Sequence, residues 1–235
     1  MKRILMFFLL IFLAINFVYA QNERFYQEKS LIVDTNLIVD ELLANKIYTY
    51  FKDSKLFKWE DRNNCEDRAN AIGILLDSWN VPNYKAWIFS GRFLSKDQGL
   101  LTDRYGVRWK YHVATVIPIK RLNKTDFVVI DPATTSTETP FTISTWANNV
   151  TDKMYSYYIL TPGDRYIWTG KGKKIGQNTF TVRNATNYEY TIQGLAGFNG
   201  LNHKDRKAMR SAEGQERLNA AQKGVESLKS NMPTL

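Results

Sequence analysis

The segment that constrains the fold most is residues 107–119, where side chains alternate between two faces. Apolar and aromatic residues recur at every second position on one face: Trp109, Tyr111, Val113, Thr115, Ile117 and Ile119. A period of two is typical of a β-strand. A second apolar run at 127–130 follows after a polar turn, and Pro132 ends it because proline cannot donate to a sheet. The pattern predicts an antiparallel hairpin and therefore an antiparallel sheet.

The register of this hairpin follows if its turn is assumed to span 120–123. Ile119 then faces Lys124, and His112 faces Asp131 directly across the ladder. Opposed residues have Cβ atoms about 5 Å apart, close enough for a carboxylate to hold an imidazole. A slip of one residue would break this pairing. We therefore expect His112 and Asp131 to lie together on one face.

The only cysteine of the chain, Cys65, begins a second regular pattern. Apolar residues follow it at helical spacing until Pro82 stops the run: Ala69, Ile72, Leu76 and Trp79. Asn63 and Glu66 fit a capping box, which would place Cys65 in a first helical turn among unsatisfied N–H groups. The positive helix end favours a thiolate, whereas Glu66 and Asp67 oppose it.

A lone cysteine is more often a small core residue than a nucleophile, so other residues must decide. The two histidines, His112 and His203, exclude a multi-histidine zinc site. No phosphate-binding loop, dinucleotide fingerprint or serine nucleophile elbow follows a strand, and we expect no cofactor or metal. The remaining chemistry is acyl transfer, with Cys65 as nucleophile, His112 as base and Asp131 as the residue that orients the imidazole.

Both ends of the chain differ from its middle. Residues 1–20 have a basic start, an apolar run at 4–18 and a small-residue ending, which predict a signal peptide cleaved after Ala20 and a secreted or periplasmic protein without a transmembrane anchor. Residues 21–163 hold 18 Lys and Arg against 17 Asp and Glu, while 164–235 hold 12 against 6. This basic excess suits an acidic surface as partner or a solvated face. No aromatic-spaced nucleic-acid motif accompanies it.

The domain prediction is a signal peptide at 1–20, a catalytic domain at 21–165 and a basic C-terminal extension at 166–235. The remaining patterns predict the following elements: a packing helix ending near 51, strands at 84–90 and 154–160, a loop at 91–106, an amphipathic piece around Trp146, short strands at 166–170, 178–183 and 188–193, and a polar helix at 203–229. Helices and an antiparallel sheet together give an α+β fold.

Four segments resemble, in order and spacing, the secreted bacterial protein-glutaminases: 64–69 (NCEDRA), 109–114 (WKYHVA), 129–133 (VIDPA) and 145–148 (TWAN). The resemblance covers roughly residues 60–165. It implies a fold similar to the transglutaminase and cysteine-protease core, and deamidation of glutamine side chains in proteins or peptides through a thioester. Carried over by position, the nucleophile is Cys65, the base is His112 and the orienting residue is Asp131.

The chain departs from this family at several points. Glu66 stands where an aromatic residue is expected, a one-cysteine chain has none of the family's disulfides, and residues 168–235 have no recognised counterpart. Three alternatives stay open: a transglutaminase or a cysteine peptidase with the same triad, or a non-catalytic exported binding protein. Four aromatic residues either line a substrate groove or belong to the core: Trp87, Phe89, Trp109 and Tyr111.

Overall fold

The computed structural model of the protein describes ten stretches of the chain: residues 25–27, 37–60, 64–90, 101–102, 108–109, 111–135, 137–150, 156–169, 179–198 and 203–233. The signal peptide expected at 1–20 lies outside them, and export stays a prediction. Within the described residues, no helix is both long and apolar enough to cross a membrane.

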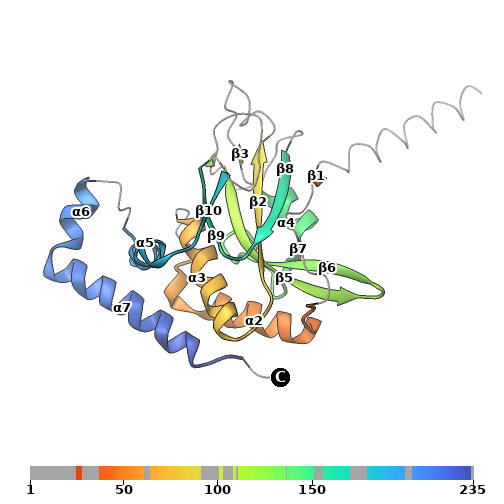
Figure 1. The fold of residues 1–235 in the computed structure, drawn as a ribbon, viewed down its shortest axis with the longest axis horizontal. Helices are drawn as coiled ribbons and strands as arrows, with labels where there is room; N and C mark the ends of the chain where they lie inside the picture. Colours follow the sequence, from red (N-terminus) through yellow and green to blue (C-terminus); the bar gives the residue numbers. More distant parts are fainter. Residues whose placement is uncertain are drawn as a thin grey trace, which may run out of the picture.

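A six-stranded sheet forms the centre of the molecule (Figure 1). Its strands lie in the order β1 (Phe25–Gln27), β8 (Ser156–Pro162), β2 (Tyr84–Ser90), β5 (His112–Arg121), β6 (Lys124–Ile130) and β7 (Phe141–Thr142). All neighbours pair antiparallel except β1 and β8. The strands expected at 84–90, 127–130 and 154–160 and the α+β fold are confirmed.

The long alternating run is divided between two sheets. Its first part, β4 (Arg108–Trp109), pairs with β3 (Leu101–Thr102), which lies in the stretch expected to be a loop. The central strand β5 begins only at His112. The first strand of the β5–β6 hairpin therefore begins at His112 and not at residue 107, where the sequence pattern placed its start.

The register of that hairpin differs from the expected one. Arg121 pairs with Lys124, so the turn holds two residues instead of four. Leu122 in this turn has a φ of 54°, and such tight turns match the twist of the strands they join. His112 pairs with Ile88 of β2, not with Asp131. The error is two positions, and an even shift keeps every side chain on its predicted face because the side-chain period is two.

Helices cover both faces of the sheet. On one face, α4 (Ile143–Val150) buries Trp146 and Val150 against β2, β5 and β6. On the other, α2 (Glu41–Asp53), the short 3-10 helix η1 (Lys55–Phe57) and α3 (Cys65–Ser78) share the largest apolar cluster. The predicted stripe is confirmed, since all five of its members are buried: Cys65, Ala69, Ile72, Leu76 and Trp79.

The C-terminal third contains more helix than the sequence indicated. The strands expected near 166–170 and 178–183 are β9 (Arg165–Trp168) and β10 (Phe180–Val182). The strand expected at 188–193 is wrong, because Asn184 and Asn187 form a capping box that starts α5 (Ala185–Leu195). The single helix expected at 203–229 is two helices, α6 (His203–Met209) and α7 (Ala212–Lys229), since Ser211 caps the second one.

Side chains from both sides of residue 165 pack into one core. Ile192 of α5 and Val225 of α7 belong to the same apolar cluster as Ile47 of α2 and Leu76 of α3. The domain boundary at residue 165 stays a prediction, but the cluster ties the C-terminal helices to the sheet. The basic residues of α6 are exposed, and docking to an acidic surface also stays a prediction.

Val225→Ala tests this packing. We expect a loss of about 2 kcal/mol in the free energy of unfolding, because two buried methyl groups are removed from a fully buried side chain. Urea titration measures the loss. The matched control is Val182→Ala, whose side chain is 53% exposed and should change stability little. Equal effects of the two variants would mean that α7 does not pack as described.

Candidate active site

His112 and Asp131 meet in the interior between β5 and the end of β6. The imidazole Nε2 lies 2.7 Å from Asp131 Oδ2, and both side chains are almost fully buried. Although the hairpin register differs from the expected one, the predicted meeting of these two residues is present. Asp131 sits just past the last β6 residue, where the chain turns, and reaches His112 diagonally.

Two further donors hold the Asp131 carboxylate. Thr134 Oγ1 donates to Oδ2 at 2.5 Å, and Trp146 Nε1 of α4 donates to the same oxygen at 2.8 Å. Burial alone would raise the pKa of Asp131, but the His112 ring and these hydrogen bonds outweigh burial and keep that pKa below its usual value. The sequence pattern predicted no role for Thr134 or Trp146 in the site. For Thr134 the signal was its nearness to Asp131-Pro132, where a turn forms, and for Trp146 it was its place in the TWAN segment at 145–148.

Cys65 lies at the first position of α3 and faces β5. The backbone N–H of Val113, the residue after His112, is directed at the Cys65 sulfur. Thr115 Oγ1 donates to the Ala69 carbonyl at 2.8 Å and fixes α3 on the strand. A narrow cavity of about 10 Å³ has both Cys65 and Asp131 in its walls. The structure thus brings all three predicted residues to one place.

The Cys65 thiol is protonated in the resting structure. Burial raises the pKa of Cys65 well above its ordinary value, and the Glu66 carboxylate raises it further. The thiol donates to Glu66 Oε2 at 3.1 Å, while Tyr111 donates to the other oxygen at 3.3 Å. Arg68 and the Val113 N–H act in the opposite direction and lower the pKa of Cys65. Thiolate formation therefore needs a base such as His112.

The start of α3 differs from the predicted capping box. Asn64, not Asn63, occupies the cap position, with a φ of 60° and no side-chain cap bond. Glu66 is engaged with Cys65 and Tyr111 instead. The Asn64 side chain donates to the Gly194 carbonyl at 3.2 Å. Because neither side chain caps the first turn, its backbone N–H groups can face a developing oxyanion.

Arg68 is the cation on the same side of α3 as Cys65. It lies three positions further on, which places both on one helix face, and its side chain also lines the cavity. The guanidinium is buried, rests 5.8 Å from the Trp59 ring and has one nitrogen, Nη2, without a hydrogen bond among the described residues. A buried positive charge here offsets the charge of Glu66 beside the thiol.

The aromatic residues near the site belong mainly to the core. Trp87 and Phe89 are fully buried, and Trp87 donates to Thr161 Oγ1 at 2.8 Å. Tyr111 is half-buried and packs beside Trp168. The core interpretation is confirmed for Trp87 and Phe89, whereas the Trp109 side chain lies outside the described part. Among the described residues, no group of three His, Cys, Asp or Glu could hold a metal ion.

Comparison with known proteins points to one family. Residues 40–150 match the family model described as "Glutaminase". A crystal structure of protein-glutaminase aligns with a TM-score of 0.51 and 20% sequence identity, covering 68% of this chain and 86% of that one. The NMR structure of protein-glutaminase from Chryseobacterium proteolyticum aligns with a TM-score of 0.48 and 21% identity, covering 67% and 89%. The comparison with curated proteins gives no match.

Glu66→Gln should lower the pKa of Cys65, because the substitution removes a negative charge that contacts the thiol. The rate of alkylation by iodoacetamide should then rise at pH 7, and its pH profile should move to lower pH. Mass spectrometry of Cys65 measures both. The control, Glu213→Gln, changes an exposed first-turn carboxylate on α7. An unchanged profile in Glu66→Gln would contradict this view of Glu66.

Proposed function

Residues 40–150 belong to the glutaminase family, and on that premise we propose that the protein deamidates glutamine side chains in proteins or peptides through a Cys65 thioester. The observation that supports this most directly is the 2.7 Å hydrogen bond between His112 and Asp131 beside the cavity that Cys65 lines. The substrate class is a protein or peptide with an accessible glutamine.

The proposed steps assign one role to each residue. Asp131 holds His112 Nε2, so Nδ1 is the nitrogen that takes the Cys65 proton. The thiolate attacks the side-chain amide carbon, and the oxyanion is held by backbone N–H groups at the start of α3. His112 returns the proton to the nitrogen, ammonia leaves, and a thioester remains. Water, activated by His112, then hydrolyses the thioester to give glutamate and the free thiol.

The burial of the thiol favours a side-chain amide over a backbone peptide bond. Cys65 is 7% exposed, and the cavity beside it is small. A glutamine carboxamide stands at the end of two methylene groups and can enter a narrow space. A peptide bond would have to bring the backbone on both sides of it to the sulfur. This argument supports deamidation or amine transfer over peptide cleavage.

Purified protein should release ammonia from a glutamine-rich unfolded protein, and the substrate mass should rise by about one unit per ammonia. Cys65→Ala should release none, because the thioester cannot form. Intact-mass analysis separates the alternatives. Crosslinks would indicate a transglutaminase, fragments without ammonia would indicate a peptidase, and an inert protein in every assay would support a non-catalytic binding role.

Trp146→Phe tests the support of Asp131. The variant keeps an aromatic ring in the core but removes one donor to the carboxylate. We expect the deamidation rate to fall by roughly tenfold, in line with about 1.5 kcal/mol for a hydrogen bond to a charged group. The control is Trp87→Phe, which removes the buried bond to Thr161 instead. A similar loss in both variants would contradict a specific role of Trp146.

A further inference from the structure

Residues that follow the family-matched region contact the first turn of α3 on the side away from the cavity. Tyr166 of β9 donates to Asp67 Oδ1 at 2.5 Å. Both side chains are buried, with 2% exposure for Tyr166 and 8% for Asp67. Burial raises the pKa of Asp67 to about 7, and the Tyr166 hydroxyl offsets part of that rise. A buried carboxyl group needs a hydrogen-bond partner, and Tyr166 of β9 is that partner.

Helix α5 contacts the same turn through Gly194. Its carbonyl accepts the Asn64 side chain, one residue before the nucleophile. A Cβ on Gly194 would lie 2.0 Å from Asp67 Oδ2 and 2.6 Å from Asp67 Cβ. Because real side chains do not approach so closely, only glycine allows α5 to lie against α3 here.

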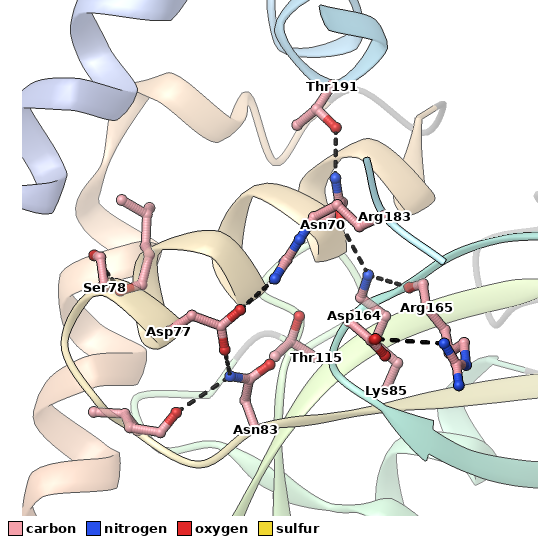
Figure 2. A network of polar contacts seen from close by, with 12 residues as sticks. Asn70, Asp77, Ser78, Asn83, Lys85, Thr115, Asp164, Arg165, Arg183 and Thr191 are labelled. Atoms are coloured by element: carbon pink, nitrogen blue, oxygen red, sulfur yellow. Dashed lines mark hydrogen bonds and ion pairs between the residues drawn. The ribbon is translucent and has the colours of Figure 1, made fainter. Parts of the chain in front are cut away.

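A second set of contacts lies one turn further along α3 (Figure 2). Asn70 donates to Thr191 Oγ1 of α5 at 2.8 Å and accepts from the buried Lys85 ammonium at 3.3 Å. Lys85 also donates to the Arg165 carbonyl at the start of β9. Four residues thus hold α3 on this side and are called the brace below: Arg165 and Tyr166 of β9, and Thr191 and Gly194 of α5.

The brace and the active site use opposite sides of the helix. Successive residues of an α-helix are rotated by about 100°, so Asp67 points about 200° away from Cys65. Cys65 faces β5 and the cavity, while Asp67 faces β9 and α5. If the contacts to Asp67 are lost and the first turn of α3 rotates or shifts, the Cys65 sulfur on the opposite side of the helix therefore moves with it.

We propose that the brace is part of the catalytic unit, and that Asp67 is the positioning residue through which Tyr166 and Gly194 set the place of the Cys65 sulfur. The inference rests on the proposed function for its activity assay, but not for its thiol assay. Displacement of a reacting atom by about 1 Å can cost about 10²-fold in rate. The brace lies outside residues 40–150, so this chain positions its nucleophile with residues beyond the matched region.

Tyr166→Phe removes the hydroxyl and keeps the ring. We expect kcat for deamidation of an unfolded glutamine-rich protein to fall roughly 10- to 100-fold while KM stays nearly constant, because substrate contacts are unchanged. Alkylation of Cys65 by iodoacetamide should become several-fold faster, since a loosened first turn exposes the thiol. Tyr188→Phe is the control, because it removes a hydroxyl bond from α5 to Glu226 of α7 that does not involve α3. It should leave kcat, KM and alkylation unchanged.

Gly194→Ala provides an independent variant, combined with Asp67→Ala. Gly194→Ala should lower kcat in the native background and have a smaller further effect in Asp67→Ala, because the carboxylate atoms that it would displace are already absent and only the contact with the Cβ of residue 67 remains. Asp67→Asn should restore most of the kcat lost in Asp67→Ala, since its amide oxygen can still accept from Tyr166. Thermal unfolding of each variant identifies losses that come from unfolding alone.

The outcomes separate the two proposals. If the native protein releases no ammonia, the proposed function fails, while the alkylation rates still decide whether the brace acts on Cys65. Equal alkylation and equal kcat in Tyr166→Phe and Tyr188→Phe would overturn the role of the brace. Additive effects of Gly194→Ala and Asp67→Ala would also overturn it, because the two residues would then act separately.

Discussion

The burial of α3 between the central sheet and the C-terminal elements is the constraint on which the site depends. One side of the helix is fixed on β5 by the bond from Thr115 to the Ala69 carbonyl. The same side carries Cys65, and His112 begins the strand that it faces. The core therefore brings the proposed nucleophile and the proposed base together on two regular elements, α3 and β5. A site built on rigid elements holds its reacting atoms with less variation.

The two acidic residues nearest the proposed reaction centre, Asp131 and Glu66, have different effects on protonation in this buried site. Asp131 has three donors on one oxygen, so its pKa is low despite burial and it stays ionised to hold His112. Glu66 acts differently, because its negative charge beside the sulfur adds to the larger effect of burial and raises the pKa of Cys65 further. Arg68 opposes that effect from the same helix face. Burial is the largest cause of the raised pKa of Cys65, and Glu66 and Arg68, two positions apart on α3, act on it in opposite directions, which explains why substitution of either should move it.

The sequence predicted those features that depend on local periodicity. The alternation around His112 and the helical stripe after Cys65 both follow directly from the geometry of strands and helices. Even the wrong hairpin turn left His112 and Asp131 on adjacent positions of one face, because the error was an even number of residues. Features that depend on distant partners could not be predicted. The local pattern indicated a cap at Asn63, but Asn64 occupies the cap position, and its side chain bonds to Gly194, 130 residues away, instead of capping the helix. Likewise, α5 carries alternating aromatic residues that suggest a strand, and its capping box decides otherwise.

A buried neutral thiol has a consequence for how the proposed catalytic cycle begins. The thiolate is the form that reacts with oxidants as well as with amides. If residues 1–20 direct export as predicted, the only cysteine of the chain meets an oxidising environment without a disulfide partner. Glu66 and burial keep it protonated there, and so protect it. The same protection means that, in the proposed mechanism, a base is needed to remove the thiol proton, and His112 is that base. Protection of the resting thiol and dependence on the base are therefore two results of one arrangement.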